Sequence, residues 1–158
     1  MQDSEFLQAA EAIQKRFAGL SGLQYLKAVI SDGVSYPFAQ LLDMRLKAAE
    51  DGYAEIESTP SYKFYNPMMR IHGGYLASLM DSAMGSAVIT KLPSGSGAGT
   101  VQLSVNYVHK VDVESGVLTV KAKALHAGRI MLTTEGHLHD AQGRLCVHAT
   151  GTFLVYPK

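Results

Sequence analysis

A single apolar helix, followed by several long strands, constrains the fold of this 158-residue chain more than any other feature. Between residues 72 and 90 the apolar positions recur at helical spacing. They are Leu76, Leu79, Met80, Ala83, Met84 and Ala87. Beyond residue 99 the period changes to two, which predicts strands at 100–108, 116–126, 129–139 and 144–156.

A meander of this kind needs a second layer on the face that it buries. At about 1.5 Å per residue, helix 72–90 is just under 30 Å long, enough to cross several strands about 4.8 Å apart. The prediction is therefore an α+β fold in which one antiparallel sheet wraps round one long central helix. The alternative is an open α+β sandwich with all helices on one side.

The residues before this helix predict a helical extension. Residues 4–18 have an amphipathic pattern, and Ser21 with Gln24 forms a capping box that opens a second helix to about Ile30. Short strands are predicted at 41–49 and 53–58, a flexible loop at 93–99, and a tight turn at 140–143. We interpret 1–158 as a single domain with a helical extension over 1–35.

Charge and composition exclude several classes of protein. Lys plus Arg and Asp plus Glu both total 14, and no basic stripe is present, so nucleic acid and anionic membranes are not the expected partners. The single cysteine, Cys146, excludes an internal disulfide and a cysteine-rich zinc site. We expect a cytoplasmic protein, since MQDSE at the N-terminus lacks the basic residues of a signal peptide and no apolar run is long enough for a membrane span.

The start of the central helix is unusual. Gly73 and Gly74 lie in its first turn, and no Ser, Thr, Asp or Asn stands before His72 to cap it. Uncapped N–H groups at the positive end of the helix dipole can bind an anion. We therefore expect the helix start to be left bare, as an oxyanion site. The alternative is that the two glycines serve only close packing.

One acid, Asp81, lies two turns further on, off the apolar stripe. It shares a line with the small residues Gly74, Ser78 and Gly85. Asp81 is then either a solvated acid beside packing residues, or a carboxylate that completes a hydrolase site with the helix start. The spacing alone leaves both interpretations open.

Several stretches resemble the hotdog-fold acyl-CoA thioesterases of the phenylacetate-degradation type, over roughly residues 38–156. These are NPMMRIHGG at 66–74, DSAMGSA at 81–87, GTVQLSVNY at 99–107, GR at 128–129 and DAQGRLCVHATGTF at 140–153. The spacing from the asparagine to HGG and from HGG to the aspartate is that of the family. The chain departs from the family at Met69 and Arg70, where a glycine and a small residue are usual, and at residues 108–110.

The resemblance implies a role for each matched residue. Asp81 would be the general base or nucleophile, and the Gly73 N–H would polarise the thioester carbonyl. Asn66 would hold that carbonyl or the attacking water, and Thr100 would orient the water. His72 would support the site structurally. The resemblance also implies a site across a dimer interface, in which Asp81 and Thr100 face Asn66 and Gly73 of a second copy, in a homodimer or a dimer of dimers.

Other residues are candidates for binding the acyl-CoA substrate. Gly74 and Ser78 would line the approach to the helix, and Gly128 belongs to a matched motif. Arg129 and Lys110 can donate charge-assisted hydrogen bonds to the phosphates of coenzyme A. No cofactor is expected. A non-catalytic acyl-CoA binding module is the alternative function, and a hotdog dehydratase is disfavoured because no histidine precedes a proline-rich turn.

Glu135, His137 and His139 share one face of a predicted strand. Pairing through the turn at 140–143 would set His148 opposite Glu135 and Cys146 opposite His137, which resembles a set of metal ligands. Imidazoles on the outer face of a sheet are more often solvated or packed in a contact between subunits. We therefore predict no metal site.

Overall fold

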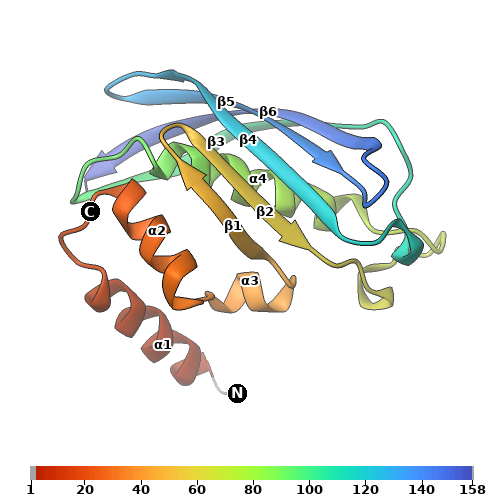
Figure 1. Cartoon of the computed structure of the whole chain (residues 1–158), viewed down its shortest axis with the longest axis horizontal. Coiled ribbons are helices and arrows are strands. Elements are labelled where there is room, and N and C mark those ends of the chain that lie inside the picture. Colours follow the sequence, from red (N-terminus) through yellow and green to blue (C-terminus); the bar gives the residue numbers. More distant parts are fainter. Residues whose placement is uncertain (1–2, 158) are drawn as a thin grey trace.

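The computed structural model describes residues 3–157, and one sheet with one central helix dominates it (Figure 1). The helices are α1 (Asp3–Arg16), α2 (Gly22–Asp32), α3 (Pro37–Leu41) and α4 (Gly73–Ile89), with short 3-10 turns η1 (Tyr62–Phe64) and η2 (Val113–Ser115). The strands are β1 (Arg45–Glu50), β2 (Tyr53–Ser58), β3 (Ser96–Tyr107), β4 (Leu118–Ala127), β5 (Met131–His139) and β6 (Leu145–Pro157).

The six strands form one antiparallel sheet in the order β1-β2-β4-β5-β6-β3. Helix α4 lies in the concave face of this sheet, against every strand (Figure 1). All six apolar positions that predicted the helix are buried, and five of them have no exposed surface. The predicted wrapped sheet is confirmed, and helix α4 differs from the predicted range by one residue at each end.

Helix α2 packs on β1 and on α4, and a glycine lets it come close. The Gly22 N–H donates to the Leu92 carbonyl at 2.9 Å. A Cβ at Gly22 would lie 1.7 Å from the backbone oxygen of Ile89, so no other residue fits there. The predicted capping box of Ser21 and Gln24 is present, and Gly33 ends the helix at φ 63°.

Two predicted boundaries are wrong. Residues 37–41 form α3, with Pro37 at its first position, so β1 begins at Arg45 and not near residue 41. The predicted loop at 93–99 is shorter, because β3 begins at Ser96 and pairs with the end of β6. Both boundaries depend on strand pairing. The pairing of β1 with β2 begins only at Arg45, whereas residues 96–99 pair with the end of β6.

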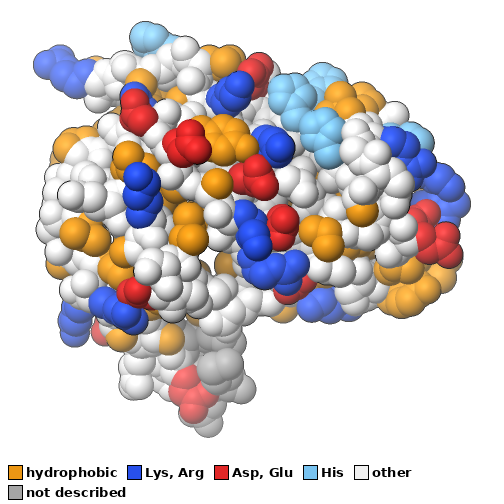
Figure 2. Space-filling view, viewed as in Figure 1, with side chains coloured by type: hydrophobic (Ala, Val, Ile, Leu, Met, Phe, Trp, Pro, Cys, Tyr) orange, Lys and Arg blue, Asp and Glu red, His pale blue; other side chains and the backbone are white. Residues whose placement is uncertain are grey.

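The outer face of the sheet is polar. Figure 2 shows acidic and basic side chains interspersed there, with several histidines gathered together.

The predicted register of β5 and β6 is wrong. His137 pairs with His148, and Glu135 with Thr150, because the turn includes Arg144 and a register shift follows Leu138. Cys146 points into the core, and no group of His, Cys, Asp or Glu within residues 3–157 has the arrangement of a metal site.

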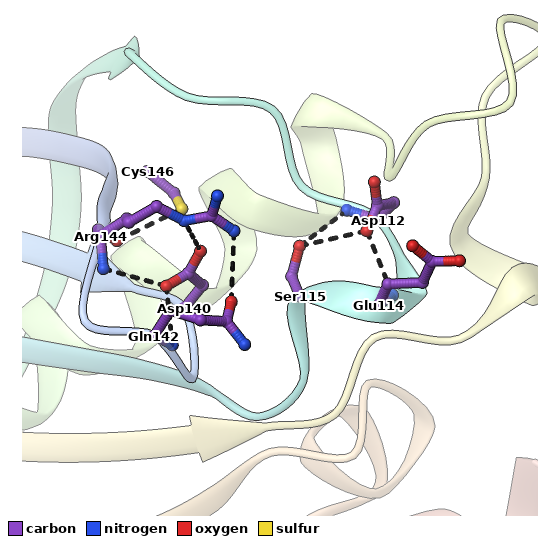
Figure 3. A network of polar contacts seen from close by, with 7 residues as sticks. All are labelled: Asp112, Glu114, Ser115, Asp140, Gln142, Arg144 and Cys146. Carbon is purple, nitrogen blue, oxygen red and sulfur yellow. Dashed lines mark hydrogen bonds and ion pairs between the residues drawn. The ribbon is translucent and has the colours of Figure 1, made fainter.

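The β5–β6 turn is organised by a buried carboxylate, Asp140 (Figure 3). Its oxygens accept hydrogen bonds from the backbone of Gln142 and Arg144, and from Arg144 Nε at 2.7 Å. Burial alone would raise the pKa of Asp140, but these hydrogen bonds and the Arg144 charge hold that pKa below its usual value. The network fixes the turn, with Gly143 at φ 77°.

None of the helices in the described chain is long and apolar enough to cross a membrane.

Candidate active site

Asp81 and Thr100 are brought together by α4 and β3. The Thr100 hydroxyl donates a 2.8 Å hydrogen bond to Oδ1 of Asp81. In the described chain, Oδ2 of Asp81 has no hydrogen-bond partner, and the carboxylate is only half-buried. It can therefore accept a proton from a water molecule or attack a substrate.

A β-bulge turns Thr100 toward the helix. The register with β6 shifts between Thr100 and Gln102, and Val101 is left 56% exposed. Before the bulge Thr100 faces inward, and after it Leu103 does so, which reverses the alternation along the strand. Strict alternation along 100–108 would place Thr100 and Leu103 on opposite faces, and the bulge at Val101 is what puts both on the inner face.

A cavity of about 380 Å³ opens beside this pair. Asp81 and Thr100 form part of its wall, and Ser82, Gly85 and Ser86 continue the wall along α4. The rest is mostly apolar and comes from α2, α3, β1 and β2, including Leu26, Val29, Phe38, Met44 and Ile56. The small residues of α4 therefore make room for a ligand, and the helical extension covers that room. This volume and lining are typical of small-molecule sites.

The helix start is not bare, contrary to the prediction. The imidazole of His72 caps the helix, because its Nδ1 accepts from the Gly74 N–H at 2.8 Å. Nδ1 must then be unprotonated in this arrangement. The Gly73 N–H has no acceptor among residues 3–157, so the open anion site consists of one N–H group. Sequence reasoning missed the cap because histidine is an uncommon capping residue.

Asn66 organises the loop before α4. Its Oδ1 accepts from the N–H groups of Met68 (2.9 Å) and Arg70 (3.2 Å), which leaves its amide NH₂ without a partner in the described chain. Met69 adopts a left-handed φ of 58°. That conformation favours glycine, so Met69 stands at a backbone angle that residues with a side chain rarely adopt.

Tyr107 contributes to the helix start and was missed as a site residue. Its hydroxyl donates to the Gly73 carbonyl at 2.9 Å, and a Cβ on Gly73 would lie 3.2 Å from its ring. The end of β3 therefore holds the first peptide of α4 in position. In the sequence, Tyr107 is marked only by its place in the matched stretch 99–107. Its hydrogen bond to Gly73 spans 34 residues, so no local pattern reveals it.

One protomer does not bring the two halves of the expected site together. Gly73 and Asp81 are eight residues apart on one helix, which is about 12 Å along its axis. Asn66 lies on the Gly73 side and Thr100 on the Asp81 side. A carbonyl held at Gly73 is therefore out of reach of Asp81 in the same chain.

The predicted binding residues are spread over the molecule. The Ser78 hydroxyl donates to the Gly74 carbonyl within α4, and Gly128 makes a tight turn in which a Cβ would lie 2.9 Å from the Met131 carbonyl oxygen. These contacts give Ser78 and Gly128 structural roles. Their contact with a substrate stays a prediction.

Arg129 and Lys110 are both exposed and lie near opposite ends of strand β6. The turn that carries Arg129 is bonded to Val155, and Lys110 follows the strand position opposite Val147. Eight strand residues separate these positions, or roughly 27 Å. Within one protomer they cannot bind the same phosphate group.

A central helix wrapped by an antiparallel sheet, with its acid facing an edge strand, defines a hotdog-fold protein. The chain belongs to the thioesterase superfamily, which it matches over residues 69–147. A proposed esterase of Archaeoglobus fulgidus is 28% identical over 113 residues, covering 72% of this chain and 71% of that protein.

Solved structures have the same fold. A phenylacetic acid degradation-related protein of Ralstonia eutropha JMP134, itself a proposed thioesterase, superposes with a TM-score of 0.74 at 23% identity, covering 82% of this chain and 98% of that one. A protein of Streptococcus mutans UA159, solved bound to acetyl CoA, superposes with a TM-score of 0.66 at 25% identity, covering 73% and 90% of the two chains.

Proposed function

We propose that this protein hydrolyses acyl-CoA thioesters, with Asp81 as general base or nucleophile. The observation that carries the proposal is the 2.8 Å hydrogen bond from Thr100 to Asp81 on the wall of an apolar cavity. A binding module for acyl-CoA has no need of a carboxylate with a free oxygen at that position. The acetyl CoA bound to the Streptococcus mutans neighbour supports a coenzyme A thioester as the substrate.

In the general-base form, Asp81 takes a proton from a water molecule that Thr100 orients. The water oxygen bonds to the thioester carbonyl carbon, and the carbonyl oxygen becomes an oxyanion. The Gly73 N–H and the Asn66 amide NH₂ are the groups available to stabilise that charge. Collapse of the intermediate breaks the C–S bond, and the departing thiolate receives the proton held by Asp81.

The site requires two chains, because Gly73 lies about 12 Å from Asp81 along α4. Among residues 3–157, strand β3 pairs only with β6 and leaves a free edge of 12 residues, on which Val101 and Tyr107 are more than half exposed. A long unpaired edge is a template for pairing with another chain. We propose a homodimer, which can pair again into a tetramer, with two equivalent sites per dimer. A cytoplasmic location suits a coenzyme A substrate and the single, unpaired thiol of Cys146.

The test is release of free thiol from a panel of acyl-CoA substrates by the native protein and by Asp81→Asn. We expect turnover with the native protein, and a loss of about 10²-fold or more in the variant, the usual scale for a positioned acid or base. The variant should unfold at a similar temperature, since Asp81 lies outside the buried core. Equal turnover by the two proteins would remove Asp81 from the mechanism. Binding of acyl-CoA without any turnover would favour the binding module.

A further inference from the structure

Two cavities adjoin at the helical extension. The first, of about 380 Å³, has Asp81 and Thr100 in its wall. The second, of about 670 Å³, lies between α1, α2 and the start of β3. Four residues line both cavities, and they therefore form the partition between them: Tyr25, Tyr36, Ile89 and Ala98.

The two halves of this partition differ in how firmly they are held. Ile89 ends α4 and Ala98 lies in β3, so both belong to elements anchored in the core. The other half consists of two side chains, Tyr25 from α2 and Tyr36 from the segment before α3. Their hydroxyl groups are joined by a 2.8 Å hydrogen bond. This tyrosine pair is the part of the partition that depends on side-chain contacts alone.

The extension keeps the tyrosine pair in place. The close approach at Gly22 fixes the start of α2 against α4, and the ring of Phe17 packs edge-on against Tyr25 with centroids 5.6 Å apart. An acyl chain that passed the pair would break the hydroxyl hydrogen bond and leave polar groups beside apolar carbon. That exchange is unfavourable unless the hydroxyls find new partners.

We propose that the tyrosine pair sets the upper length of the acyl group that the site accepts. This inference rests on the proposed function. The substrates are then apolar acyl groups that fill the first cavity, such as aryl-acyl or medium-length chains. Long-chain fatty acyl groups are excluded, because they would have to enter the second cavity.

The test compares kcat/KM for straight-chain acyl-CoA substrates of increasing length. For the native protein we expect a rise of about fourfold for each methylene that is buried. A fall of about tenfold or more should follow once the first cavity is full. Tyr36→Ala opens the partition and should move this fall to longer chains. Tyr36→Phe, which keeps the ring and loses the hydroxyl group, should move it less.

Gly85→Leu should act in the opposite direction. Gly85 lines the first cavity only, and its new Cβ would make an ordinary 3.6 Å contact with Phe153, so the added side chain takes up space in the cavity. The fall in kcat/KM should then come at shorter chains. Tyr62→Ala is the matched control, since Tyr62 is 69% exposed and lines neither cavity. It should leave the length profile as it is.

The outcomes separate this inference from the proposed function. If the native protein hydrolyses short chains and both Tyr36 variants keep its length limit, the tyrosine pair is not the wall and the proposed function stands. If nothing is hydrolysed, calorimetric binding of the same substrates replaces kcat/KM. If the length limit in binding moves to longer chains in Tyr36→Ala, the tyrosine pair sets the length limit although the proposed hydrolysis is wrong. If no substrate binds, both the length limit and the proposed function are overturned.

Discussion

Thr100 on an edge strand and Asp81 on the central helix are joined by a 2.8 Å hydrogen bond across 19 residues of sequence. The bond uses one carboxylate oxygen and leaves the other without a partner in the described chain, and both residues line the 380 Å³ cavity. Thr100 therefore fixes the orientation of the carboxylate without neutralising it.

Replacing Thr100 by valine tests this relationship. Valine keeps the shape of the side chain and loses the hydroxyl group, so Asp81 is no longer held in one orientation. We expect kcat to fall by about tenfold, less than for Asp81→Asn, since positioning contributes only part of general-base catalysis. Thr100→Ser, which restores the hydroxyl, should recover most of the activity. A Thr100→Val enzyme with native kcat would show that Thr100 does not position the base.

Subunit complementation tests the shared site. The structure makes Asn66→Asp a better partner for Asp81→Ala than Asn66→Ala, because aspartate keeps the oxygen that accepts from Met68 and Arg70 and loses the NH₂ donor. Each variant should be inactive alone. Once subunits exchange, mixed dimers should regain one intact site each, or about a quarter of the native activity for a random mixture. Demonstrated exchange without recovered activity would place the whole site within one chain.

Gly22→Ala tests the docking of α2. The new Cβ would lie 1.7 Å from the backbone oxygen of Ile89, and the backbone cannot move aside as the end of a flexible side chain can. We expect a loss of about 1–3 kcal/mol in the free energy of unfolding, and a weakened preference among acyl chain lengths as the extension shifts. Gly99→Ala is the control in denaturant unfolding, since its Cβ would meet only the Tyr156 ring at 3.5 Å. Equal stability of the two variants would contradict the close docking.

Asp140 links stability to pH. Its pKa is held below the ordinary value in the folded protein, so its contribution is present above the unfolded pKa of about 3.8. That contribution is lost as the pH falls through the folded pKa. We expect Asp140→Asn to lower the free energy of unfolding by about 1–3 kcal/mol at pH 7, with a smaller difference from the native protein below pH 3.8.

Asp51→Asn is the matched control for that measurement. Its ion pair with Lys91 is exposed, and such pairs contribute between about zero and 1 kcal/mol. A stability difference for Asp140→Asn that stays constant from pH 7 to pH 2 would show that the carboxylate charge is not what stabilises the turn.

Removal of metal ions should leave hydrolysis unchanged, because the proposed chemistry needs a carboxylate, a water molecule and backbone or amide donors. Prolonged dialysis against a chelator, followed by the thiol-release assay, measures this. Activity lost on chelation and restored by zinc would bring the histidines of β5 and β6 back as ligands.

The sequence by itself determined the features that depend on local spacing. The apolar stripe of α4 follows from its helical period, because residues three and four apart lie on one face of a helix and are buried together. The capping box of Ser21 and Gln24 and the turn before Gly143 are equally local. The match of Asn66, Gly73, Asp81 and Thr100 to a known family also needed no coordinates.

Only the tertiary structure decided the features that depend on contacts between distant residues. The bulge at Val101 reversed the alternation of β3 and brought the Thr100 hydroxyl within hydrogen-bond distance of Asp81. The pairing of His137 with His148 followed from a register shift. The cavity exists because α2 approaches α4 at Gly22, 67 residues before Ile89. A side-chain period specifies which residues share a face, but the partner strand and the close approach of backbones determine where that face meets another.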